Sequence, residues 1–520
     1  MFRKSISRRA CLFAGCCFRF YFFLVLTMFS AVAVADEYYW KSFTSSIHTA
    51  NAGNIEIMHD RYPDPFSYCA AYADAYVFNT KEKTWRVTGF SVEFKGVARA
   101  DCRVQLSSVN APWPSTASAL YQFGRYGKNC LAGKIYNPTT GGCGYDNQKG
   151  LPPPLSCVGN PINVSLGNKF QIESDYRDST GGLFFFHAYN SLDGFWRHGY
   201  STYLRFALDK VSLVFSHGRE VFFVLNGDVT IPASIDVGVL VKNNNNWHFL
   251  SAENERFVFN AAGRLISWSN ASGVIHRLTY SGNIVTVTDH LGNSLSFTEG
   301  SNHQPLVMNA PGVQVTYEYD ASQRLSSVRR VVDGEVTQRK YHYEVMDNPN
   351  LLTGITDELG VRYATWSYDA EGRAISSEHA GGADRVEIAY NDDGSATVTN
   401  ELGKKATYRF QTIQGIKRIT AIEGEPSPNC PSSNSTFTYD DRGLLKTKTD
   451  NKGIVTTYDY NDRGLEVTRT EAIGTPQART VTTEWHPSMY LPLAVTEPDR
   501  ITRYQYNAQG GQLSRTVENR

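Results

Sequence analysis

The chain has 520 residues, of which 41% are hydrophobic and 20% charged, so it can bury a core and is not disordered throughout. Lys+Arg and Asp+Glu both number 51, which excludes the basic surplus of an electrostatic nucleic-acid binder. The 30 Tyr, 28 Phe and 42 Gly against 6 Met favour strands joined by tight turns over helices.

The first 35 residues have the features of a targeting segment. Five basic residues precede an uncharged stretch from Phe20 to Ala35, which ends in Ala33-Val34-Ala35. This order predicts a secretory signal peptide over residues 1–35. A membrane anchor is the alternative, but the uncharged stretch is shorter than the roughly 20 residues that a spanning helix needs. We expect export to the periplasm, cell surface or medium, with no stable membrane span after cleavage and a mildly acidic mature chain.

Six cysteines remain after cleavage, and five of them precede residue 160. In an exported chain they predict disulfides, although sequence alone leaves the pairing open. We expect residues 36–148 to form a small disulfide-bearing domain. Our hypothesis for its pairing is Cys69–Cys102 and Cys130–Cys143.

Residues 149–156 contain three consecutive prolines, which predict a stiff linker and a domain boundary. A β-rich segment follows, because Val211, Leu213 and Phe215 alternate with the period of a strand. The same segment contains an Asn-x-x-x-Gly-Asn element, an acidic-Tyr pair, a strand that ends in Tyr-Asn-Ser, and a Trp-x-x-Gly-Tyr. In this order the elements resemble the N-terminal module of Rhs-family proteins. We place that module at residues 157–254.

From residue 255 to 520 the chain repeats itself. One set of turns opens with Tyr or Phe before Asp or Asn and closes with Gly; its members include Asp369 with Gly372, Asp440 with Gly443, and Asn461 with Gly464. A second set alternates with the first and includes Asp289 to Gly292 and Asp357 to Gly360. The opening Asp or Asn can bond the backbone two residues on, and Gly accepts a positive φ. Turns about every ten residues predict a long antiparallel meander of short strands.

These turns carry the YD-repeat signature of the Rhs and teneurin-like families. The resemblance implies an all-β fold in which hairpins curl into a spiral, forming part of a hollow shell. In Rhs proteins such a shell encloses a polymorphic toxin used in bacterial competition, and an Asp-Pro boundary motif releases it. Here the only Asp-Pro is Asp64-Pro65, upstream of the repeats, so that role cannot be transferred. The array stops at Arg520 inside a repeat, and we expect a truncated array with an exposed edge near 514–517.

We find no motif of a hydrolase or a phosphate-binding loop, and no histidine paired with a nearby Cys or Glu at ligand spacing. We therefore predict a secreted or surface scaffold with no catalytic, cofactor-binding or metal-binding residues, and no enzymatic activity. The expected partner is a toxin domain or a downstream Rhs polypeptide, not a nucleic acid. The alternative is a surface adhesion or carbohydrate-binding protein whose partners are cell-surface glycans.

Overall fold

The structure is a computed structural model of the chain. It describes residues 434–520, residues 146–424 except 180–181, 208, 227–228, 234–237 and 301, and separate stretches between residues 39 and 144. The chain divides into two compact units, Met1–Ala35 and Asp36–Arg520. The predicted signal peptide lies outside the described residues, as do Cys130 and Cys430.

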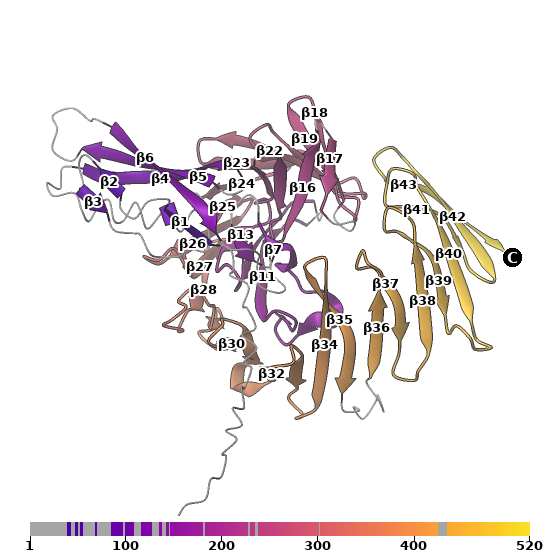
Figure 1. Cartoon of the computed structure of the whole chain (residues 1–520). Helices are drawn as coiled ribbons and strands as arrows, with labels where there is room; N and C mark the ends of the chain where they lie inside the picture. The colour runs from indigo at the N-terminus through magenta and orange to yellow at the C-terminus, as the bar shows by residue number, and fades with distance from the viewer. Residues whose placement is uncertain are drawn as a thin grey trace, which may run out of the picture. The chain divides into compact units, whose positions relative to one another are not determined.

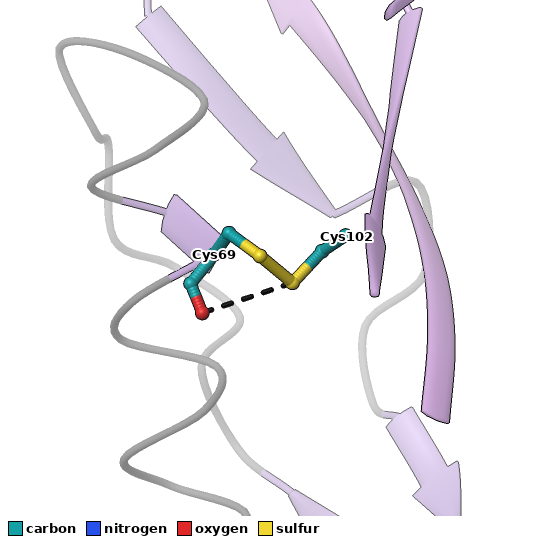
Figure 2. The surroundings of a disulfide bond; sticks show 2 residues. All are labelled: Cys69 and Cys102. Atoms are coloured by element: carbon teal, nitrogen blue, oxygen red, sulfur yellow. Dashed lines mark hydrogen bonds between the residues drawn. A yellow bond between two sulfur atoms is a disulfide. The ribbon is translucent and has the colours of Figure 1, made fainter. Parts of the chain in front are cut away.

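The N-terminal part of the second unit contains a four-stranded antiparallel sheet in the order β1-β6-β5-β4, together with two short hairpins. The strands are β1 Tyr39–Ser42, β2 Ile47–Thr49, β3 Gly53–Ile55, β4 Trp85–Gly96, β5 Arg99–Ser108, β6 Thr116–Tyr126, β7 Ile135–Tyr136 and β8 Cys143–Gly144. A disulfide joins Cys69 to Cys102 on β5, and both residues are buried (Figure 2). Cys143 is also disulfide-bonded. Cys157 is a free, half-buried thiol.

A second sheet, which we call the small sheet, has five strands in the order β13-β12-β11-β10-β9. Its strands are β9 Cys157–Val158, β10 Ile162–Asn163, β11 Asn168–Arg177, β12 Phe184–Asn190 and β13 Trp196–His198. The first four residues of β11, Asn168 to Gln171, are buried, whereas Ile172 is exposed.

The third sheet, which we call the long sheet, has thirty antiparallel strands, β14 to β43, among the described residues. Each strand pairs with the next one in the chain, and Figure 1 shows β34 to β43 following one another in this way. The predicted all-β meander is therefore confirmed.

The strands of the first half of the long sheet are β14 Tyr203–Ala207, β15 Lys210–Val214, β16 Glu220–Asn226, β17 Val229–Pro232, β18 Val239–Asn243, β19 Asn246–Leu250, β20 Arg256–Phe259, β21 Leu265–Ser269, β22 Ile275–Ser281, β23 Ile284–Asp289, β24 Ser294–Glu299, β25 Pro305–Ala310, β26 Val313–Tyr319, β27 Leu325–Val332 and β28 Glu335–His342.

Those of the second half are β29 Gly354–Thr356, β30 Arg362–Tyr368, β31 Ala374–His379, β32 Val386–Tyr390, β33 Ala396–Thr399, β34 Lys405–Ile413, β35 Ile416–Gly424, β36 Ser435–Tyr439, β37 Leu445–Thr449, β38 Val455–Tyr460, β39 Glu466–Glu471, β40 Arg479–Trp485, β41 Pro492–Thr496, β42 Arg500–Tyr506 and β43 Gln512–Asn519. Three short 3-10 turns complete the described elements: Asp146–Gln148, Pro154–Ser156 and Ala380–Gly382.

The main core lies between the small sheet and the long sheet. It includes Phe185 and Trp196 from the small sheet and Phe297, Val315 and Trp366 from the long sheet. Strands β22, β26 and β30 alternate buried residues with more exposed ones, as expected for a sheet with one covered face. Beyond β34 the strands contribute few buried residues.

The two edges of the long sheet differ. The β14 edge is covered by the β20–β21 turn, since Leu204 N donates to Gly263 O at 2.9 Å and Tyr203 forms a bridge with Arg264. Among the described strands, β43 pairs with β42 alone, and its Leu513 and Val517 are exposed. The edge expected near 514–517 is thus open in this structure.

The Pro-rich segment 149–156 packs against the residues that follow it. The Lys149 ammonium is buried and lies 2.7 Å from Asp146 and 2.9 Å from Asp193. Gly150 N donates to the Asn190 side chain at 2.7 Å. Burial opposes the charged form of Lys149, but Asp193 and Asp146 raise its pKa. The contacts with Asp193 and Asn190, which are distant in the sequence, fix the segment against the small sheet.

Candidate functional site

The repeat turns use their signature residues to build the hairpins. Asp369 Oδ1 accepts hydrogen bonds from Glu371 N at 3.1 Å and from Arg373 N at 2.8 Å. Gly372 has φ +78° and donates its N–H to Asp369 O at 3.0 Å. The ladder shifts register just before the turn, as in a type I turn followed by a left-handed bulge residue.

The other predicted turn residues have the same geometry. Asp440 accepts from the backbone of Arg442 and Leu444, and Asn461 accepts from Arg463 and Leu465, at distances of 2.9 to 3.1 Å. Gly443 and Gly464 have φ +80° and +75°. The carboxylates and amides that the sequence analysis singled out are therefore occupied by their own turns.

The tyrosine of the signature joins one hairpin to the preceding one. Its hydroxyl donates to a backbone carbonyl 14 to 20 residues earlier in the chain, at 2.7 to 2.9 Å; the pairs are Tyr319 to Pro305, Tyr368 to Leu352, Tyr390 to Ala374, Tyr439 to Ile419 and Tyr460 to Leu445. For Tyr390 and Tyr460 the acceptor follows the preceding turn directly. We call these bonds the tyrosine tethers.

The arginine that follows the turn glycine stacks on the next hairpin. Arg373 lies 4.3 Å from the ring centroid of Tyr390, and Arg264 lies 4.0 Å from that of Tyr280. Such cation–π contacts contribute about 0.5–1 kcal/mol at exposed sites. The arginine stack and the tyrosine tether together connect successive hairpins along one rim of the sheet.

A buried polar cluster joins the small sheet to the long sheet. His187 Nδ1 lies 2.8 Å from Asp175, and Nε2 lies 2.9 Å from the Tyr341 hydroxyl. That hydroxyl donates to Glu173 at 2.9 Å, and Glu173 also pairs with Arg339 at 2.9 Å. We call this group the His187 cluster, and it borders a polar cavity of about 360 Å³.

The His187 cluster fits a protonated imidazole. Since the Tyr341 hydroxyl donates to Glu173, its oxygen accepts from Nε2–H, while Nδ1–H donates to Asp175. Burial works against the charged ring, but Asp175 and Glu173 raise the pKa of His187. Both ring nitrogens are engaged, so this arrangement holds the two sheets together and presents no free base.

A second cluster surrounds the Glu299 carboxylate, which pairs with His198 Nε2 at 3.0 Å, His303 Nδ1 at 2.9 Å and Arg264. Burial opposes ionisation, but the hydrogen bonds from the two histidines hold the pKa of Glu299 well below its usual value. The sequence analysis found no histidine paired with a nearby Glu at ligand spacing. That reading was wrong for Glu299 and His303, which are four residues apart and hydrogen-bonded.

Neither cluster gathers the ligands of a metal site. Across the described residues, no group of three or more His, Cys, Asp or Glu side chains is placed to hold a metal ion. None of the helices in the described part of the chain has the length and apolar character of a membrane span.

The model of the RHS Repeat family matches residues 439–475. Residues 439–475 thus resemble an RHS repeat. The match covers the turns of Asp440 and Asn461 with β37 and β38 between them, and it confirms the YD-repeat recognition. No curated protein matches the chain.

Several solved structures are similar to this chain. A TcdB2-TccC3-TEV structure is 11% identical with a TM-score of 0.29, covering 69% of this chain and 19% of that one. A TcdB2-TccC3-Cdc42 structure is 13% identical with a TM-score of 0.28, covering 81% and 25%. The Tc holotoxin pore of Photorhabdus luminescens is 12% identical with a TM-score of 0.27, covering 81% and 25%. The chain thus spans about a quarter or less of the length of these solved chains.

Sequence reasoning found the RHS-repeat turns because their chemistry is local. It missed the acceptors of the tyrosine tethers and the His187 cluster, since these pair residues from separate hairpins or sheets. A signal for the tethers was present, because the tyrosine precedes the turn Asp or Asn in most of the repeats. That signal gave the residue but not its partner.

Proposed function

We propose that this chain is the wall-forming scaffold of an exported toxin assembly, with a toxin domain or a further Rhs polypeptide as its partner and no catalysis of its own. The observation that supports this proposal most directly is that the signature side chains form hydrogen bonds within the repeat sheet itself. The turn Asp, Asn and Gly residues and the tethering tyrosines all serve to extend one continuous sheet. The buried clusters support the same role, because their groups pair across two sheets.

Export by a cleaved signal peptide over residues 1–35 is part of this proposal, as is the division into a disulfide-bearing domain, a linker, a module at 157–254 and an array at 255–520. A disulfide in the N-terminal sheet fits an oxidising compartment. N-terminal sequencing of secreted material tests the export: a mature chain that begins at Asp36 supports it, and an intact Met1 contradicts it.

The scaffold role is tested by isolating the tagged chain from its native cells. We expect a stoichiometric partner polypeptide that resists protease while bound and is digested once the complex is dissolved in denaturant. A chain that purifies alone and binds a glycan saturably on an array would instead establish adhesion as its function.

A further inference from the structure

The last eight strands of the long sheet, β36 to β43, which we call the flap, have a narrow junction with the rest of the sheet. Among the described residues, two pairs join β35 to β36: Ala421 with Thr436 and Ile422 with Ser435. By contrast, β34 and β35 are joined by eight pairs. The Tyr439 tether to Ile419 O, at 2.7 Å, lies at this junction.

The small sheet and the segment before it support the long sheet only as far as β35 among the contacts of the described residues. The last of these contacts are Lys417 Nζ to Ser165 O at 3.1 Å and Gln148 Nε2 to Gly415 O at 3.1 Å. The buried core ends at Val398, with Tyr408 and Phe410 packed against it. The flap therefore lacks the apolar support that the preceding strands receive.

The flap is held at a second place, far from the junction. Asn254, in the β19–β20 turn, donates from Nδ2 to Tyr490 O at 3.0 Å and accepts from Tyr490 N at 2.8 Å. This reciprocal pair joins residues 236 positions apart. Asn254 is buried and has φ +63°. We call Asn254 and the β40–β41 loop, residues 486–491, the latch.

The loop side of the latch is shaped by Arg463. Its guanidinium donates to His486 O and Met489 O, both at 2.9 Å, and to Pro487 O. The Met489 side chain is buried, and its sulfur lies 3.8 Å from an Arg256 nitrogen. A Cβ at Gly510 would lie 3.5 Å from the Met489 sulfur and 3.9 Å from Ala271 Cβ. At the latch, the buried Met489 side chain of the flap therefore packs against Arg256, near the start of the repeat array.

From these contacts we infer that the flap is a hinged element, which opens at the latch and bends at the β35–β36 junction while the small sheet and β14 to β35 stay folded. Local opening occurs where few buried apolar contacts hold a segment. The flap meets this condition, and its far end is held by a small set of polar contacts around one buried methionine. The inference goes beyond the proposed function and does not depend on a toxin partner.

Peroxide oxidation of methionine, followed by mass spectrometry on the full mature chain, tests this inference. Met489, which is 6% exposed, is the reporter, and two methionines are internal references: Met346 is 94% exposed and Met308 is fully buried. Asn254→Gly removes both latch hydrogen bonds, and glycine adopts the positive φ of this position without strain. We expect it to raise the oxidation rate of Met489 about tenfold, while the rates of Met308 and Met346 stay unchanged.

The matched control is Asn244→Gly. Asn244 also has a positive φ, +55°, but is exposed in the β18–β19 turn. The Asn244→Gly variant should keep the oxidation of Met489 slow, whereas Arg463→Ala should make it faster. If the oxidation of Met489 stays slow in both Asn254→Gly and Arg463→Ala, the latch does not hold the flap. If Met308 is oxidised faster together with Met489, the whole core opens and the hinged flap is refuted.

A locked flap completes the test. Ala271→Cys with Gly510→Cys places two Cβ atoms at a separation suited to a disulfide, about 3.5–4.5 Å. Combined with Asn254→Gly, the oxidised disulfide should restore slow oxidation of Met489. Persistently fast oxidation of Met489 in the locked chain would overturn the inference.

Discussion

At the scale of single residues, the signature tyrosine stabilises this protein through its hydroxyl as well as its ring. Tyr368→Phe keeps the ring and removes the tether to the buried carbonyl of Leu352. We expect the local opening free energy of β29 and β30 to fall by about 1 kcal/mol, as measured by native-state hydrogen exchange.

Tyr506→Phe is the matched control for the tether, because Tyr506 holds the same place in its repeat and its hydroxyl has no hydrogen-bond partner among the described residues. This variant should leave exchange unchanged. Equal losses in Tyr368→Phe and Tyr506→Phe would show that the tether contributes nothing.

One repeat turn lacks its glycine, and the structure shows the consequence. Gln323 takes the glycine position after Asp320 and adopts φ +61°. A residue with a Cβ is strained there by roughly 1–2 kcal/mol. Gln323→Gly should therefore stabilise β26 and β27 by about 1 kcal/mol, in the same exchange measurement. Ser322→Gly, one residue earlier, should give no such gain.

At the scale of elements, the contact between the small sheet and the long sheet depends on a charge that titrates. Because the folded-state pKa of His187 is raised, the folded protein binds that proton more tightly than the unfolded chain. This contribution to stability is full below the unfolded pKa of about 6.5 and is lost as pH rises through the folded value. Asp175, Glu173 and the Tyr341 hydroxyl face the ring and favour its protonated form, whereas the positive charge of Arg339 acts against it.

The prediction is that the difference in melting temperature between wild type and His187→Asn is larger at pH 5.5 than at pH 8.5. His342→Asn serves as the control, since burial lowers the pKa of His342, whose Nε2 lies 2.8 Å from Thr356 Oγ1. The difference between this variant and wild type should not grow toward acid pH. For His187→Asn, a difference that grows toward alkaline pH would contradict the protonated His187 cluster.

The hairpins were predictable from sequence, because each turn contains its own hydrogen-bonding side chain and its own residue with positive φ. The turns that begin at Asp369 and Asn461 are examples. The pairing of whole sheets was not predictable, since His187 meets Tyr341 across 154 residues. The loop at 486–491 interrupts the repeat pattern, and its partner Asn254 resembles an ordinary turn residue. Buried pairs between distant segments leave no local periodicity.

At the scale of the whole molecule, the N-terminal disulfide should act on its own sheet. In the chain-entropy model, a loop closed across 33 positions stabilises the fold by roughly 3–4 kcal/mol. Replacing both Cys69 and Cys102 with Ser should speed hydrogen exchange in β4 to β6. The strands β22 to β33 should exchange as in wild type. Equal loosening of these strands would show that the two regions unfold as one unit.

The small sheet and the long sheet share one core, so residues 157–200 pack against the strands of the long sheet. A Cβ at Gly159, beside β9, would lie 3.4 Å from Ser377 Cβ on β31. The decisive measurement is peptide mapping of the mature chain with Gly159→Cys and Ser377→Cys in a Cys157→Ser background. We expect the 159–377 disulfide to form spontaneously in the folded protein. Reduced thiols at both positions under oxidising conditions would contradict it.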